Sequence, residues 1–158
     1  VGQAFRRVSR YCGFDEIEAG KTMGLSAYGS GDINLFNEEY GHSLCSTQLK
    51  PEGNTTAYVG PQIPPKDLAY NLQKSAERHA IFMIKKTVEL TNKKNVCVSG
   101  GFFLNCVSNY SILKNTDVNL YVDPIAYDGG IAIGSALLEY YEHFCDRSRP
   151  IRFSTVLA

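Results

Sequence analysis

Apolar residues recur at helical spacing over the longest patterned stretch of the chain, residues 66–92. The stripe consists of Leu68, Leu72, Ala76, Ala80, Met83, Val88 and Leu90. Two prolines precede this stretch and suit a first helical turn, and two lysines follow it and complement the negative end of the helix dipole. The pattern predicts one long helix that packs its apolar stripe against a sheet. Three polar residues on it are expected to be solvated or to support a neighbouring site: Gln73, His79 and Lys85.

Two strand–turn–helix units follow that helix. In the first, residues 96–98 form a short β-branched run that ends at Gly100-Gly101, after which a helix is expected. In the second, residues 118–122 are typical of a strand, a proline ends it, and residues 127–130 open an apolar helical run. Two such units in succession predict an α/β fold, with a parallel sheet covered by helices. Ligands of open α/β sheets bind beyond the carboxyl ends of the strands.

The remaining segments are predicted from turn residues and short apolar runs. Residues 3–12 are expected to form a helix that Gly13 stops, and the glycine-rich block around Lys21 is expected to form a loop that passes under a ligand. Residues 31–65 are interpreted as an irregular insertion that could contact an acceptor substrate. Within it we expect short strands at 33–36 and 43–49, turn residues at 51, 53 and 54, and the apolar pair Tyr58-Val59.

Composition and charge are those of one globular domain. The chain has 158 residues, and its 16 acidic side chains balance 16 basic ones, so no net field favours nucleic acid or an anionic membrane. The five cysteines show no Cys-x-x-Cys spacing, which indicates buried, reduced thiols rather than a zinc site. We expect a cytoplasmic protein with no nucleic acid and no membrane as partner. The start at Val1, without methionine or signal peptide, is typical of a piece of a longer protein.

Two positions after the predicted strands carry candidate chemistry, a glycine pair and an aspartate. Gly100-Gly101 allows a positive φ and a close approach of another group, and the amides of a helix that starts there favour an anion such as a phosphate. Taken alone, such a pair is more often a simple tight connection between a strand and a helix. Asp128 either caps the first turn of the following helix or is held at a loop tip as a metal ligand facing the same cleft.

Three blocks of the chain resemble, in order, the motifs of the NodU/CmcH-type O-carbamoyltransferases. Residues 18–29 resemble the family's E-G-K-x-M-G-L-A-x-Y-G block, residues 99–109 its GG-x-x-LN-x-x-x-N signature, and residues 127–137 its D-x-G-x-A-x-G-A-A-L segment. The resemblance runs from Val1 to about His143. More distantly, residues 2–10 are similar to the G-E-A-F-D-K-V-A block of the tRNA threonylcarbamoyladenosine transferases. Gln3, Arg6 and Arg7 replace the Glu, Asp and Lys of that block, which favours the O-carbamoyltransferases.

The resemblance implies a fold and a domain arrangement. Both families share the actin-like ATPase fold (ASKHA, ribonuclease H-like), with a mixed sheet and covering helices. Residues 1–145 would be the carboxyl-terminal half of the carbamoyltransferase actin-like domain, and residues 146–158 a tail toward a second, YrdC-like domain. The amino-terminal half and the YrdC-like domain are missing from this chain. We expect the isolated half-domain to be inactive, to expose an apolar patch and to self-associate as a homo-oligomer.

The resemblance also implies a reaction, the transfer of a carbamoyl group from an ATP-derived carbamoyl-adenylate to a hydroxyl of a small-molecule acceptor. Gly100 and Gly101 would place backbone amides near the adenylate phosphate. Asn105 and Asn109, about one turn apart on the next helix, would share a face and hydrogen-bond the nucleotide, or would only be polar surface.

The other implied contacts come from the remaining motif blocks. Lys21 would neutralise phosphate charge, although a loop lysine is also commonly only solvated, and Gly2 would lie near the ribose. Asp128 matches the aspartate that holds a divalent metal, expected to be iron, together with a His-x-x-x-His pair that has no counterpart here; the metal would polarise the carbamoyl carbonyl. The sequence identifies no general base and no particular acceptor. Alternatives are a tRNA threonylcarbamoyl transferase, an actin-fold kinase and a non-catalytic nucleotide-binding module.

Overall fold

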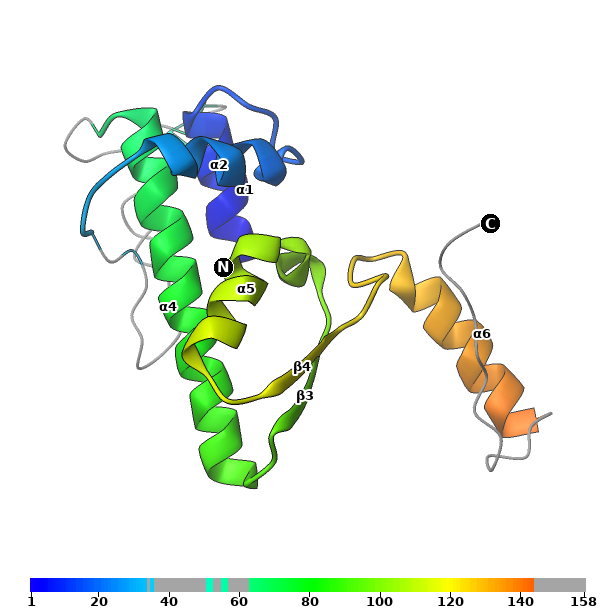
Figure 1. Cartoon of the computed structure of the whole chain (residues 1–158). Coiled ribbons are helices and arrows are strands. Elements are labelled where there is room, and N and C mark those ends of the chain that lie inside the picture. The colour runs from blue at the N-terminus through cyan, green and yellow to red at the C-terminus, as the bar shows by residue number, and fades with distance from the viewer. Residues whose placement is uncertain (34, 36–50, 53–54, 57–62, 144–158) are drawn as a thin grey trace, which may run out of the picture.

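The computed structural model describes residues 1–33, 35, 51–52, 55–56 and 63–143 of the chain as an α/β unit (Figure 1). The strands predicted at 33–36 and 43–49, the pair Tyr58-Val59 and the tail from residue 146 lie wholly or partly outside these residues. Within the described part of the chain, no helix combines the length and the apolar character needed to cross a membrane.

The α4 helix (Pro65–Thr91) is the longest element, and the other elements pack along it. Its 27 residues span about 40 Å at a rise of about 1.5 Å per residue. Pro64 and Pro65 begin it as expected, and Asn92 ends it in the left-handed conformation with φ 52°. The prediction of a helix at 66–92 is therefore confirmed to within a residue at each end.

The predicted apolar stripe of α4 is only partly right. Its first four members are buried, whereas Met83 and Leu90 are 50% and 75% exposed. Ile84 is buried instead, four residues after the buried Ala80, because the face that meets the other elements continues along the i, i+4 row. The prediction is wrong for Met83 and Leu90, whereas Val88, four residues after Ile84, is half-buried.

The amino-terminal half of α4 holds one hydrophobic cluster together with the first three helical elements. These are α1 (Gly2–Tyr11), α2 (Ala19–Leu25) and the 3₁₀ turn η1 (Ser26–Tyr28), which gather around this end of α4 in Figure 1. The buried members of the cluster are Ala4, Phe5, Val8, Leu35, Leu68, Leu72 and Ala76. Two short strands, β1 (Pro51–Glu52) and β2 (Thr55–Thr56), pair antiparallel, and β2 contacts α1.

The carboxyl-terminal half of α4 holds a second cluster, built with the two predicted strand units. The strands β3 (Asn95–Val98) and β4 (Asn119–Val122) pair in parallel, with Val98 opposite Val122. Between them lie the 3₁₀ turn η2 (Gly101–Leu104) and the α5 helix (Cys106–Asn115). Ala80, Ile84, Val98 and Ile112 form the buried centre. One face of the sheet is thus covered by α4 and α5, while Cys97 and Tyr121 on the other face are exposed.

The glycine-rich block around Lys21 forms a helix and not the loop that we expected. Residues 19–25 are α2, because Gly20 and Gly24 lie on open helix surface and only weaken the helix without breaking it. Gly29 and Gly31, which follow α2, do allow a close approach, but it is an approach of their backbone to α4. A Cβ on Gly29 would lie 2.1 Å from the Lys66 carbonyl oxygen, and one on Gly31 2.6 Å from the Asn71 amide.

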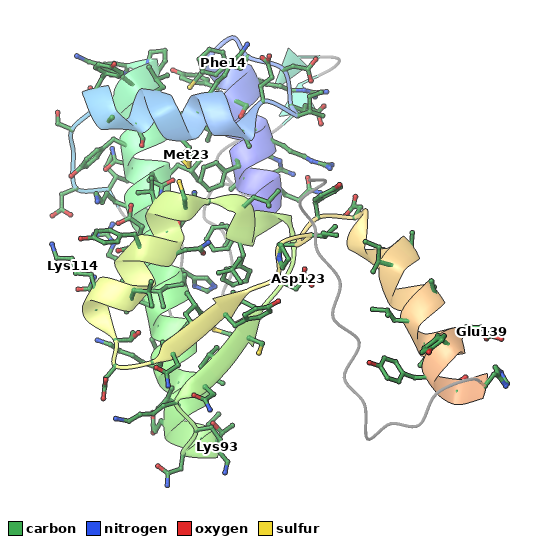
Figure 2. All side chains as sticks on the ribbon, turned by 45° about the vertical axis from the view of Figure 1, so that its right-hand side comes forward. Phe14, Met23, Lys93, Lys114, Asp123 and Glu139 are labelled. Carbon is green, nitrogen blue, oxygen red and sulfur yellow. The ribbon has the colours of Figure 1, made fainter. Side chains whose placement is uncertain are left out.

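The last described element, α6 (Gly130–His143), has no buried residue. It lies apart from the other helices in Figures 1 and 2, beyond the loop that follows β4 and Asp123. Its apolar residues therefore face solvent, with Ile131 72% and Leu138 60% exposed. The expected exposed apolar patch is confirmed by these residues.

Candidate functional site

The Gly100-Gly101 turn lies at the carboxyl end of β3, next to the loop that follows β4. The two strand ends are joined by a hydrogen bond from the Asp123 amide to the Val98 carbonyl oxygen, at 3.1 Å. Gly100 has φ 102°, a conformation that L-residues with a side chain rarely adopt. A Cβ on either glycine would meet no atom within 4 Å, so open space adjoins the turn. This geometry leaves room for a group that approaches the backbone.

The turn is followed by a short 3₁₀ segment and not directly by a helix. In it the Phe103 amide donates to the Gly100 carbonyl oxygen at 2.9 Å and the Asn105 amide to the Phe102 carbonyl oxygen at 3.0 Å. The amides of Gly101 and Phe102 open this segment and, among the described residues, have no backbone acceptor outside it. They are two donors available to an anion at the turn.

Asn105 is the N-cap of α5 and does not lie within the helix. Its Oδ1 accepts the Ser108 amide at 3.0 Å, as a capping side chain does. Its Nδ2 donates to Oε1 of Gln73 on α4 at 2.8 Å. One hydrogen of the Asn105 amide remains after this bond, so the side chain is held in one orientation with a donor to spare.

Gln73 connects the cap to a buried carboxylate. Its Nε2 lies 3.1 Å from Oγ of Ser108 and 3.1 Å from Oε1 of Glu77. The other Glu77 oxygen accepts from Ser111 on α5 and from Lys74 on α4, each at 3.1 Å. Since Gln73, Glu77 and Ser108 are all buried, the helices α4 and α5 are joined by a polar network whose members satisfy one another.

Asn109 faces the same turn from within α5. Its Nδ2 donates to the Phe103 carbonyl oxygen at 2.7 Å and so braces the 3₁₀ segment. Its Oδ1 is buried and has no hydrogen-bond partner among the described residues. Asn105 and Asn109 thus flank the turn one helical turn apart, Asn105 as the cap of α5 and Asn109 from within its first turn, with the Asn109 amide donating to the Asn105 carbonyl oxygen at 3.1 Å.

Gly2 lies at the start of α1, and the fold brings this start toward the glycine turn. Phe102 of the turn and Val1 pack against the same hydrophobic cluster. A Cβ on Gly2 would meet no atom within 4 Å.

Lys21 is less available to a ligand than the amides of the glycine turn. It lies on α2, where its Nζ pairs with Oε1 of Glu18 at 2.5 Å. That hydrogen bond is the main reason why the pKa of Glu18 is lowered from its usual value. Lys21 would have to leave Glu18 to reach a phosphate.

Asp128 lies in the loop between β4 and α6 and is exposed. Only its backbone is engaged, with its carbonyl oxygen accepting the Ile131 amide at 3.3 Å. The described residues contain a group of three potential metal ligands, Glu139, Glu142 and His143, which lies on α6 and does not include Asp128. A lone carboxylate does not make a metal site, so the residues described here do not complete one at Asp128.

Sequence reasoning missed the network that supports the turn. Gln73 was interpreted as solvated or supporting, and Glu77, Ser108 and Ser111 were not singled out. The signal was present in the spacing, because Gln73 and Glu77 are four residues apart on α4 and Ser108 and Ser111 three apart on α5. Only the packing of the two helices shows that these pairs face each other.

Comparison with known proteins gives one family. The sequence model of the family described as "Carbamoyltransferase N-terminus" matches residues 1–137. The chain is 27% identical over 152 residues to nodulation protein NolNO of Sinorhizobium fredii, and 26% identical over 152 residues to nodulation protein NolO of Bradyrhizobium diazoefficiens. It is also 32% identical over 130 residues to an uncharacterised protein of Synechocystis.

These matches cover most of this chain and a small part of each relative. They include 87%, 87% and 77% of the chain, but only 22%, 28% and 21% of the respective relatives. The chain therefore spans about a quarter of the length of the curated relatives that it matches.

Proposed function

Because this chain belongs to the carbamoyltransferase family, we propose that it forms part of a site that transfers a carbamoyl group from a carbamoyl-adenylate to an acceptor hydroxyl. In that reaction the acceptor oxygen bonds to the carbamoyl carbon, the bond from this carbon to the phosphate oxygen breaks, and AMP and the acceptor's proton are released. The observation that carries the proposal is the glycine turn at the end of β3, placed within the part of the chain that the family match covers.

We propose that this turn holds the phosphate of the adenylate. The Gly101 and Phe102 amides lack backbone acceptors outside the 3₁₀ segment, and the amino-terminal end of α5 adds the positive end of its dipole. The open space beside both glycines is the space that the phosphate would need.

We assign the nucleoside to the neighbouring side chains. The spare Asn105 amide hydrogen and the unpaired Oδ1 of Asn109 offer a donor and an acceptor beside the turn. The start of α1 at Gly2 would adjoin the ribose. Lys21 would exchange its Glu18 partner for the phosphate, which makes it the weakest of the proposed contacts.

Asp128 is proposed as one ligand of a divalent metal, expected to be iron, whose other ligands lie outside this chain. Its support is the resemblance and an exposed side chain that forms no hydrogen bond or ion pair with any described residue. We also propose that the α/β unit is one half of an actin-like domain, which the remainder of a longer protein completes. The acceptor and the metal both depend on that remainder.

Calorimetric titration of the chain with AMP and ATP, with and without a divalent metal, tests the proposal. Gly101→Val extends into the open space, and its Cβ would meet no protein atom within 4 Å, so we expect it to abolish binding while the fold is kept. Gly24→Val is the matched control, because a Cβ there also meets no atom within 4 Å but lies on α2. Asp128→Ala should weaken binding only when metal is present. Equal binding by wild type and Gly101→Val, or no binding by wild type at millimolar nucleotide, would overturn the site.

A further inference from the structure

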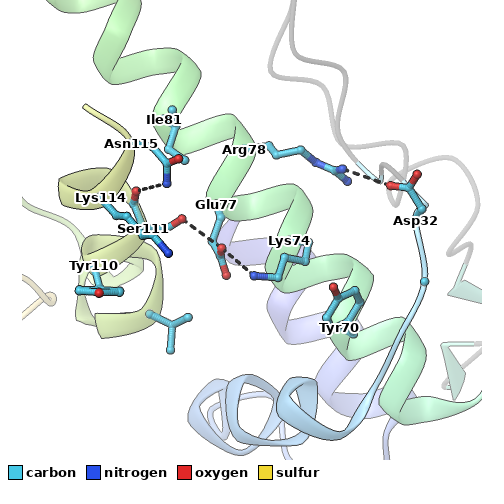
Figure 3. A pocket seen from close by; sticks show the side chains of 12 residues that line it. Asp32, Tyr70, Lys74, Glu77, Arg78, Ile81, Tyr110, Ser111, Lys114 and Asn115 are labelled. Atoms are coloured by element: carbon cyan, nitrogen blue, oxygen red, sulfur yellow. Dashed lines mark hydrogen bonds and ion pairs between the residues drawn. The ribbon is translucent and has the colours of Figure 1, made fainter. Parts of the chain in front are cut away.

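A second hollow lies on the other side of the polar network from the glycine turn. It is a groove between α4 and α5 with a volume of about 500 Å³, within the range of small-molecule sites. Figure 3 shows side chains of both helices reaching into it, with Glu77 between them. None of the residues that we propose to contact the adenylate lines it.

The charges around this groove favour an anion. Its lining includes three cations, Lys74, Arg78 and Lys114, and two carboxylates, Asp32 and Glu77. The two carboxylates differ sharply in how firmly they hold their partners.

Glu77 is buried and its charge is already matched. Lys74, Ser111 and Gln73 each place a donor 3.1 Å from one of its oxygens. Its remaining capacity to repel an anion is small, because the cation of Lys74 is in direct contact with it.

The other two cations of the lining form a weak ion pair or none with the described residues. Arg78 meets Asp32 at 3.5 Å, and the Asp32 side chain is 97% exposed, so solvent screens that pair strongly. Lys114 forms no ion pair with any described residue. Arg78 on α4 and Lys114 on α5 therefore leave positive charge on both walls of the groove.

The same walls carry apolar surface. Tyr70 and Ile81 line the groove from α4, and Val107 and Tyr110 line it from α5. Tyr110 is 67% exposed, so a large part of its ring is available to a ligand. Aromatic rings of this kind pack well against a flat body while their polar ends stay in contact with water.

We propose that this groove binds a small organic anion, with a phosphate monoester or carboxylate head and a flat apolar body. The head would lie near Lys114, with Arg78 and Lys74 as the other cations of the lining, and the body against Tyr110. The groove would thus be a second binding site, separate from the glycine turn, at the far end of the network that runs from Asn105 through Gln73 to Glu77.

Titration of the chain with phenyl phosphate, followed by nuclear magnetic resonance, tests this. We expect saturable shifts of the Tyr110, Ser111 and Lys74 signals. Inorganic phosphate should shift the same signals more weakly because it lacks the body, and benzyl alcohol should not shift them because it lacks the charge. Benzoate, compared with phenyl phosphate, distinguishes a carboxylate from a phosphate head.

Three variants decide whether the groove is responsible. Lys114→Gln should weaken phenyl phosphate binding by roughly threefold to tenfold, the value of one exposed to half-buried charged contact. Lys86→Gln is the control, since Lys86 is an exposed lysine on α4 that pairs with Glu89 outside the groove. Gly101→Val should leave phenyl phosphate binding unchanged, which separates this site from the adenylate site. No saturable shift in wild type, or equal weakening by both lysine variants, would overturn the proposal.

Discussion

At the scale of single residues, several glycines in this chain differ in what their missing side chain allows. Gly29 lies against the backbone of α4, whereas Gly20 lies on open helix surface. Gly100 adopts a positive φ that its neighbour Gly101 does not. The same residue type thus permits helix packing at one position, a special backbone conformation at another and open space beside a turn at a third.

Gly29→Ala should destabilise the protein by about 2–3 kcal/mol. The new Cβ would lie 2.1 Å from the Lys66 carbonyl oxygen, and a helix backbone cannot move away cheaply. Gly20→Ala should be neutral or stabilising by up to about 1 kcal/mol, because it adds a good helix former where nothing is in the way. Urea denaturation of both variants measures the difference. Equal stabilities would show that η1 is not packed on α4 as described.

Cys12 should be the slowest to react of the three described cysteines. Burial raises the pKa of its thiol from 9.0 to about 11, while Cys97 and Cys106 are exposed. The reactive species is the thiolate, so iodoacetamide at mildly alkaline pH should alkylate Cys97 and Cys106 first, as peptide mass spectrometry can read. Denatured protein provides the control, in which the three should react alike.

The raised pKa of the Cys12 thiol makes the stability of the protein depend on pH. Below pH 9 the Cys12 thiol is protonated in both the folded and the unfolded state, so it contributes no difference. Above pH 9 the unfolded thiol ionises first, which lowers the free energy of unfolding progressively up to about pH 11. Cys12→Ala should remove this part of the alkaline loss, and an unchanged alkaline slope in the variant would contradict the burial of the thiol.

At the scale of elements, α4 organises the molecule through polar as well as apolar side chains. Asp67, Asn71 and Ser75, spaced four residues apart, accept the backbone amides of Ser30, Ile33 and Leu35 at 2.8–2.9 Å. This row of acceptors fastens the chain after η1 along the helix. On the side of α5, Gln73 and Glu77 make the corresponding polar contacts.

A double-mutant cycle on Gln73→Ala and Asn105→Ala should show coupling between α4 and the α5 cap. Each single variant should cost about 1–3 kcal/mol, because each leaves a buried polar partner unsatisfied. The double variant should cost about 1 kcal/mol less than the sum of the two. Asn115→Ala is the matched control for α5, since Asn115 bonds only within its own helix, to the Ser111 carbonyl oxygen. It should add to Gln73→Ala without coupling, and additivity in both cycles would mean that the bond between Gln73 and Asn105 is not formed.

At the scale of the whole molecule, α6 exposes apolar side chains, and none of its residues is buried. Helices of this length are marginal in water when they stand alone, so α6 depends on further contacts for its stability. Such a surface is typical of one that meets another protein surface. Among the described residues the parallel sheet has two strands, and its face with Cys97 and Tyr121 is exposed as well.

We therefore expect the isolated chain to self-associate through α6. Ile131→Glu combined with Leu138→Lys should shift it toward monomer, because both side chains are more than half exposed and apolar. Light scattering over a wide concentration range measures the effect. Ile17→Glu is the control, since Ile17 is 87% exposed but lies before α2. A wild-type chain that stays monomeric throughout, or an equal effect of the control, would contradict the prediction.

Much of the element order could be predicted from local patterns. The helical period of residues 66–92, the β-branched run before Gly100-Gly101 and the proline after residue 122 act through backbone sterics and periodicity, which need no distant partner. The special conformation of Gly100 follows in the same way. The family is also readable, because the three motif blocks occur in order within residues 1–137, the part that the family match covers.

Other features depend on contacts between residues far apart in the sequence. The glycine-rich block became a helix because α4 and α1 pack against it, and Ile84 replaced Met83 in the core because the neighbouring elements cover one face only. Asn105 became a cap tied to Gln73, 32 residues away. The groove beside Lys114 exists only where α4 and α5 lie together. Local sequence determined where most elements and the glycine turn are, because backbone sterics and periodicity act locally. Tertiary packing decided which polar side chains form hydrogen bonds within the protein and which remain available to a ligand.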